Sequence, residues 1–128
     1  MLSGLDHLVL TTRDVDRCVD FYTRVLGMRR VEYGSGRLAL HFGTQKINVH
    51  SEGAPISPLP ERATPGSLDL CFLSSQSLHS VLEHLRANSV EIVEGPVARN
   101  GAQFPLLSVY VRDPDGNLIE IAERARFD

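Results

Sequence analysis

An internal repeat constrains the fold most strongly, because the same order of secondary structure is predicted twice along the chain. In the first half, the β-rich segment LDHLVLTT precedes a helix over Val15–Leu26, and three short strands follow. In the second half, SLDLCFL precedes a helix that begins after Ser75 or Ser77, and three further strands end in NLIEI. Each half has only about 60 residues, too few to bury a good core alone. The sequence therefore predicts an α+β fold made of two βαβββ modules.

A proline-rich segment separates the two halves. Residues 51–65 read SEGAPISPLPERATP and contain four prolines, a composition typical of a loop. We therefore expect modules over residues 1–50 and 66–124, joined by this linker into a single domain of 128 residues.

Composition excludes several classes of partner. The net charge is -3 and there is no run of Lys or Arg, which disfavours binding to nucleic acid or to an anionic membrane. The apolar stretches are strand-sized, far short of the ~20 residues that cross a bilayer. The N-terminus lacks a signal-peptide pattern, so a cytoplasmic location is expected. We interpret Cys18 and Cys71 as small, buried apolar residues.

A carboxylate lies between two isoleucines in the last predicted strand. Glu120 separates Ile119 from Ile121, and a buried carboxylate is costly without a partner ion, a shifted pKa or an exposed face. Because side chains alternate along a strand, Glu120 should point away from the face that packs on a helix.

Superposing the two halves predicts which other polar residues share such faces. LDHLVL over SLDLCF aligns His7 with Asp69, and KINVH over LIEI aligns Asn48 with Glu120. His50 falls on the same face as Asn48 by alternation. One imidazole and two carboxylates, with an amide or a second imidazole, form a donor set that suits a divalent metal.

Four segments in this order resemble the vicinal-oxygen-chelate superfamily of glyoxalases, bleomycin-resistance proteins and extradiol dioxygenases. They are LDHLVL, FYTRVLGM, LDLCF and DPDGNLIEI, and the resemblance covers nearly the whole chain. It is greatest to the glyoxalase-domain-containing protein 5 group. The resemblance implies paired curved mixed sheets around a barrel-like cavity, a homodimer, and a divalent ion (Zn, Ni, Mn or Fe). The site then lies within one chain or is shared between two.

The resemblance also implies roles for individual residues. His7 and Glu120 fall at metal-ligand positions, and Asp69 falls where most metal-binding members have histidine. Asn48 falls where glyoxalase I has its catalytic glutamate, and an amide cannot act as a base. We therefore predict metal ligands at His7, Asp69 and Glu120, catalytic roles for Glu120 and His50, and substrate contacts from Asn48, His50 and Arg99.

Arg99 belongs to the segment ARNG, which we expect to be a flexible loop, and it would hold an anionic group of the substrate. The leading hypothesis is a metal-dependent lyase or isomerase that acts on a vicinal-oxygen substrate. An extradiol-type dioxygenase, a metal-free ligand-sequestering protein of the bleomycin-resistance kind, and an interaction protein that has lost the site stay open.

Overall fold

The computed structural model describes residues 1–125 and contains the predicted order of elements in both halves. The chain divides into two compact units. Unit 1 comprises Met1–Leu68 with Pro114–Gly116, and unit 2 comprises Asp69–Asp113 with Asn117–Asp128, described up to residue 125. The α+β fold with two βαβββ modules is thus confirmed.

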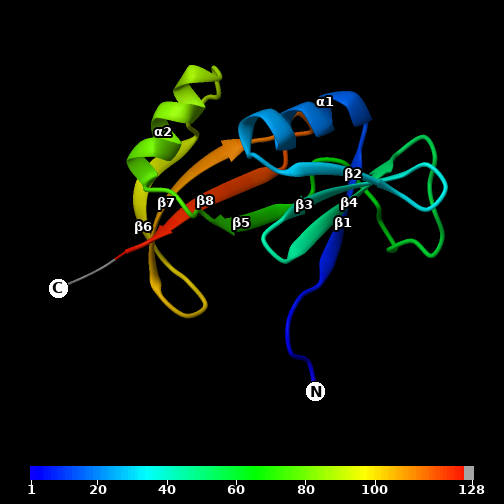
Figure 1. Ribbon diagram of the computed structural model, residues 1–128, viewed down its shortest axis with the longest axis horizontal. Coiled ribbons are helices and arrows are strands. Elements are labelled where there is room, and N and C mark those ends of the chain that lie inside the picture. Colours follow the sequence, from blue (N-terminus) through cyan, green and yellow to red (C-terminus); the bar gives the residue numbers. More distant parts are fainter. Residues whose placement is uncertain (126–128) are drawn as a thin grey trace. The chain divides into compact units, whose positions relative to one another are not determined.

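Unit 1 contains a four-stranded mixed sheet in the order β1-β4-β3-β2. Strands β1 and β4 are parallel, whereas β4, β3 and β2 are antiparallel neighbours. Figure 1 shows the first helical segment along one side of this sheet. The strands are β1 (His7–Thr12), β2 (Arg29–Tyr33), β3 (Arg37–Phe42) and β4 (Gln45–Ser51).

The first helix differs from its prediction in its last turns. Helix α1 (Val15–Asp20) begins after Asp14, whose carboxylate accepts a hydrogen bond from the Arg17 N–H, and it continues as a π-helical segment, η1 (Phe21–Val25). The Leu26 N–H bonds to the Phe21 carbonyl, the spacing that defines a π-helix. The predicted range is therefore helical, but not a single regular α-helix.

Unit 2 repeats the arrangement with a sheet in the order β5-β8-β7-β6. Helix α2 (Leu78–Ala87) begins after Ser77, whose hydroxyl accepts a hydrogen bond from the Ser80 N–H. The carboxylate of Glu123 also accepts the Leu78 N–H at this helix start. The strands are β5 (Asp69–Leu73), β6 (Glu94–Asn100), β7 (Pro105–Arg112) and β8 (Leu118–Arg124).

One predicted strand was misplaced. We expected a strand over Val90–Gly95, but residues 90–93 are irregular and β6 spans Glu94–Asn100. This strand tolerates Pro96 because it lies at the edge of the sheet, where a missing N–H breaks no ladder. Arg99 therefore lies on a strand and not on a flexible loop.

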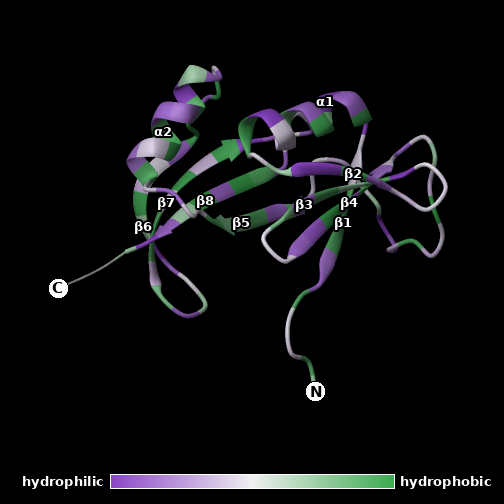
Figure 2. Cartoon of the chain, viewed as in Figure 1, coloured by the Kyte–Doolittle hydropathy of each residue, from purple (hydrophilic) through white to green (hydrophobic). Residues whose placement is uncertain are grey.

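Alternation along β8 separates an apolar face from an open face, as predicted. Ile119 and Ile121 are buried, whereas Glu120 is half-buried. Strand β7 is mostly hydrophobic in Figure 2, whereas β2 is mostly hydrophilic. Among the cysteines, Cys18 is buried as expected, but Cys71 is exposed on β5, so that prediction was wrong.

Asp115, in the DPDG turn, forms hydrogen bonds with residues at the end of β1. The Asp115 carboxylate accepts hydrogen bonds from the Thr12 hydroxyl at 2.5 Å and from the Arg13 N–H at 3.0 Å. These bonds explain why residues 114–116 belong to unit 1. No helix among residues 1–125 is long and apolar enough to cross a membrane.

Candidate functional site

The open face of the second sheet gathers polar groups in one row across its strands. Cys71 on β5 pairs in register with Glu120 on β8, which pairs with Tyr110 on β7, which pairs with Glu94 on β6. Side chains in register point to the same side of a sheet. The row therefore presents a thiol, a phenol and two carboxylates to one side.

Two of the predicted metal ligands are neighbours on this face. Asp69 lies two residues before Cys71 on β5 and pairs with Leu118, two residues before Glu120 on β8. Their Cα atoms are thus diagonal neighbours, a separation of roughly 7–8 Å, which carboxylate side chains can close. The structure brings Asp69 and Glu120 together as predicted from alternation.

The Cys71 thiol is a member of this cluster, although the sequence led us to interpret it only as a buried apolar residue. Partial burial raises its pKa to about 11, with further contributions from the Glu120 charge, from a hydrogen bond to Glu120 and from the Asp69 charge. The thiol therefore stays protonated at neutral pH and donates to Glu120 instead of acting as a nucleophile.

A cavity of about 510 Å³ lies against this row. Cys71 and Glu120 form its polar side, and the β6–β7 hairpin loop, residues 100–104, closes another side. Leu73, Phe104 and Leu106 supply apolar walls. A cavity of this size fits a small organic molecule, with Glu120 positioned to contact it.

Arg99 also lines this cavity, but it is partly engaged by neighbours. Its Nε donates a hydrogen bond to the Tyr110 hydroxyl at 2.9 Å, and its Nη2 lies 3.6 Å from the Glu94 carboxylate. The hydrogen bond to Tyr110 is the main cause that raises the Arg99 pKa above its ordinary value. A fixed guanidinium at the cavity wall is well placed to meet an anionic group of a ligand.

The remaining predicted ligand, His7, belongs to unit 1 and is oriented by its neighbour in sequence. Its Nδ1 lies 2.9 Å from the Asp6 carboxylate, and its Nε2 has no hydrogen-bond partner among residues 1–125. Histidines that bind metals commonly give their second ring N–H to a carboxylate, which fixes the tautomer. This geometry leaves Nε2 of His7 free for an ion.

Asn48 and His50 lie on the same face of β4 as predicted. Asn48 is 8% exposed, and its Oδ1 has no hydrogen-bond partner in the described part of the chain. Partial burial and the positive charge of Arg37 lower the pKa of His50. His50 is therefore largely neutral at pH 7, the state in which an imidazole accepts a proton.

The donor types present fit a divalent ion, although they are divided between the units. His7 offers a carboxylate-oriented imidazole in unit 1, and Asp69 and Glu120 offer adjacent carboxylates in unit 2. Within residues 1–125, no three His, Cys, Asp or Glu side chains are grouped as a metal site. The metal-ligand set therefore stays a prediction.

Sequence reasoning missed three contributors to these clusters. Tyr110 enters through cross-strand register, which alternation within one strand does not reveal. Cys71 shares a face with Asp69 by alternation along β5, but we had interpreted it only as a buried apolar residue. Asp6 precedes His7 directly, and this Asp-His pair was a signal that the sequence offered.

Known proteins with similar sequences identify the family. A model of the Glyoxalase/Bleomycin resistance protein/Dioxygenase superfamily matches residues 4–121. The chain is 52% identical over 119 residues to glyoxalase domain-containing protein RDO1 of Mycosarcoma maydis, covering 93% of this chain and 67% of that protein. It is 46% identical over 123 residues to virulence protein STM3117 of Salmonella typhimurium, covering 96% and 85%.

A solved structure agrees with the match in sequence. An integron cassette protein from Vibrio cholerae superposes with a TM-score of 0.95 at 47% identity, covering 98% of each chain. The two modules, their strand order and the family match thus agree with one another. This chain belongs to the glyoxalase, bleomycin-resistance protein and dioxygenase superfamily.

Proposed function

We propose that the protein is a metal-dependent enzyme of the glyoxalase type that acts as a lyase or isomerase on a small vicinal-oxygen substrate in the cytoplasm. One observation carries the proposal: Glu120 lies in the wall of a ligand-sized cavity, and a second carboxylate, Asp69, is its diagonal neighbour on the adjacent strand. The carboxylate-oriented His7 supports it as the nitrogen donor.

In this proposal, His7, Asp69 and Glu120 hold a divalent ion, which polarises adjacent substrate oxygens when bound. The apolar walls at Leu73 and Leu106 contact the carbon skeleton and exclude water. Arg99 binds an anionic group of the substrate at the cavity wall, and Asn48 contributes its unpaired amide oxygen.

Proton transfer is assigned to Glu120 and His50. Glu120 contacts the cavity directly, and the lowered pKa of His50 keeps its imidazole ready to accept a proton at pH 7. Asn48 cannot act as a base, so we expect little isomerisation of the methylglyoxal–glutathione adduct. An extradiol-type dioxygenase ranks second, because Asp69 supplies a carboxylate where that chemistry uses a second histidine.

Metal binding by chelator-treated and reloaded protein tests the proposal. We expect about one equivalent of ion per chain by elemental analysis, and at least a ~100-fold loss of affinity in Glu120→Gln and His7→Ala. Asp6→Asn should lose about 10- to 100-fold because the imidazole is no longer oriented. His79→Ala is the matched control, since His79 is an exposed helix residue that pairs with Glu83. Absence of a stoichiometric ion, or unchanged affinity in both ligand variants, would reject the proposal.

The predicted homodimer is tested with the same variants. If the ligands come from two copies, mixing His7→Ala with Glu120→Gln chains restores about a quarter of the metal sites, because half of the random dimers each regain one intact site. If the ligands come from one chain, mixing restores none.

A metal-free ligand-binding function is a second candidate. The exposed apolar side chains of Leu73 and Phe104 beside the cavity favour it, because such surface commonly binds a ligand. Turnover that disappears on chelation would exclude this alternative, whereas tight binding without turnover would favour it.

A further inference from the structure

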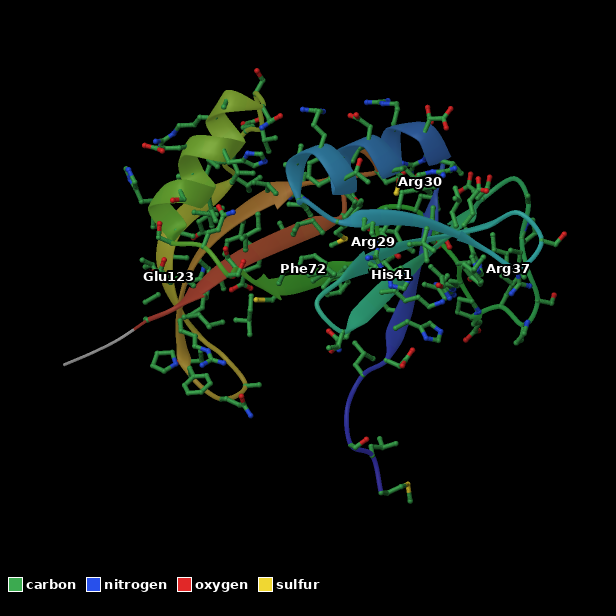
Figure 3. All side chains as sticks on the ribbon, viewed as in Figure 1. Arg29, Arg30, Arg37, His41, Phe72 and Glu123 are labelled. Carbon is green, nitrogen blue, oxygen red and sulfur yellow. The ribbon has the colours of Figure 1, made fainter. Side chains whose placement is uncertain are left out.

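The open face of the first sheet gathers basic side chains in a row that crosses all four strands. His7 on β1 pairs in register with Lys46 on β4, Lys46 with His41 on β3, and His41 with Arg29 on β2. Side chains in register share a face. Figure 3 shows Arg29 and His41 together on this sheet. The four strands thus present four basic groups along one line.

A second group of basic residues lies at the other end of the same face. Arg37 pairs with Tyr33, and His50 pairs with Thr11. Leu38 pairs with Val49, which places Arg37 beside His50 on the neighbouring strand. The positive charge of Arg37 contributes to lowering the pKa of His50. Four residues of strand, about 13 Å, separate this group from the first row.

A neutral and recessed row separates the two basic groups. It contains Val9, Asn48, Ala39 and Val31, which pair in register across the sheet. Ala39 is fully buried, and Asn48 is more than nine-tenths buried with an unpartnered Oδ1 within the described chain. Because Oδ1 is an acceptor, the Asn48 amide can bind an anion only through its Nδ2 N–H groups.

Two long side chains from opposite ends extend over this recess. The Lys46 ammonium lies 4.1 Å from the centre of the Tyr33 ring, although Lys46 belongs to the first basic row and Tyr33 lies beside Arg37. Strand β3 lies between β4, which carries Lys46, and β2, which carries Tyr33. The small side chain of Ala39 on β3 leaves room for the two long side chains to meet. The ammonium therefore lies near the centre of the face and not out in solvent.

Within residues 1–125, Arg29, Arg37 and Lys46 form no ion pair. No Asp or Glu lies on this side of strands β1–β4, and Asp6, the residue before β1, bonds to His7. In contrast, Arg30, on the opposite side of β2, pairs with Glu32 at 2.9 Å. Figure 3 shows Arg29 and Arg30 on opposite sides of β2. The chain as a whole has a net charge of -3, so this concentration of positive charge is local.

We propose that this face binds a small organic acid with two negative charges, with the Asn48 amide at its centre. The two basic groups are about 13 Å apart at the backbone, but their long side chains can extend inward, as Lys46 does. Cations from both ends can therefore meet the two closely spaced anionic groups of a short acid. A recessed centre favours a small molecule over an extended polyanion, which would contact only protruding side chains. Anion binding is measured without metal, so that its outcome does not depend on the proposed function.

An NMR titration of ¹⁵N-labelled, chelator-treated protein tests this inference. The probes are succinate, phosphonoacetate and, as a neutral control, succinamide. We expect saturable shifts at the Asn48 side-chain amide and along β3 and β4 with at least one of the two acids, and none with succinamide. Tighter binding of succinate identifies a dicarboxylate site, and tighter binding of phosphonoacetate identifies a phosphonate site. The affinity should fall with added salt.

Paired variants locate the site. Arg29→Gln and Arg37→Gln should each weaken binding about fivefold to tenfold, because each removes a charge-assisted contact. Arg30→Gln, the neighbour on the opposite side of β2, should change affinity less than about twofold. Asn48→Asp should weaken binding more than about tenfold by placing a carboxylate at the centre. If Asn48→Asp does not fold, the Arg29 and Arg30 variants still decide the question.

Three results would overturn the inference: no saturable shift with either acid, equal effects of Arg29→Gln and Arg30→Gln, or shifts confined to β5–β8. The metal titration is a separate test, and its outcome does not depend on anion binding. Loss of the metal site with intact anion binding rejects the proposed function alone, and the reverse rejects only this inference.

Discussion

In the first sheet, Asn48 occupies the middle of the open face, and in the second sheet Glu120 occupies the equivalent position. The repeat also aligns His7 with Asp69. Asn48 lies two residues after the strand partner of His7, and Glu120 lies two residues after the strand partner of Asp69. The middle row of the first sheet is neutral and is flanked by cations. The middle row of the second sheet itself holds the carboxylates of Glu120 and Glu94.

The difference shows what duplication of a backbone preserves and what it leaves free. Register and alternation fix which positions face outward, because a slip of one residue would expose every core side chain. The identity of the outward residues is not constrained in this way. The first module has cations on this face, and the second has carboxylates.

The largest effect on this contrast is expected at Cys71, which reports the negative charge of the second face. In metal-free protein, burial and then Glu120 raise the Cys71 pKa to about 11 from an ordinary 9.0. Glu120→Gln should lower it part of the way, since burial remains. Alkylation by iodoacetamide at pH 8.5 should then become about tenfold faster per unit of pKa, because only the thiolate reacts.

Mass spectrometry of the alkylated chain follows this reaction at Cys71 alone, since Cys18 is buried. Glu123→Gln is the matched control, because Glu123 contacts the start of α2 and is not among the causes of the Cys71 shift. A Cys71 alkylation rate that is unchanged by Glu120→Gln would contradict the negative character of this face.

An intermediate effect separates the two faces of β8. Glu123 accepts the Leu78 N–H at the start of α2, where a carboxylate also interacts favourably with the helix dipole. Glu123→Ala should lower the free energy of unfolding by about 1–2 kcal/mol. Glu120→Ala in metal-free protein should change it by no more than about 0.5 kcal/mol. Urea denaturation measures both, and equal losses would show that the two faces do not differ in this way.

Much of the fold follows from the sequence because its signals are local. Asp14 and Ser77 cap the two helices, and alternation around Glu120 assigns the outward side of β8 correctly. The strand predicted over Val90–Gly95 was wrong, because VEIV has the composition of a strand but is irregular here. The actual strand, β6, contains Pro96, a residue that is unfavourable within a sheet but is tolerated on an edge strand.

The site is less predictable because it depends on pairing between distant strands. Asp69 and Glu120 were expected to share a face, and the register confirms it. The row of His7, Lys46, His41 and Arg29 requires three separate pairings to be known, and no spacing in the sequence specifies them. Arg99 was assigned to a loop for the same reason, since only pairing with Leu106 makes its segment a strand.

The smallest effect concerns His50, which reports the positive charge of the first face. Partial burial and then Arg37 lower its pKa below 6.5, while its neighbour in register on β1, Thr11, is uncharged. Arg37→Gln should raise the pKa of His50 part of the way back, and a proton NMR titration of the imidazole measures it. Bound succinate should raise it too, because a nearby anion favours the imidazolium.

The same shift sets a pH dependence with a defined sign. His50 binds its proton more tightly in the unfolded chain than in the folded chain. The free energy of unfolding therefore falls as the pH drops from about 6.5 to the pKa of His50 in the folded chain. Below that pH, the contribution of His50 no longer changes. Arg37→Gln should shrink that loss, whereas Arg30→Gln, whose guanidinium pairs with Glu32 on the other side of the sheet, should leave it unchanged. Urea titrations at pH 7.5 and 5.5 compare the variants, and identical losses in both would mean that the cations of the first face do not act on His50.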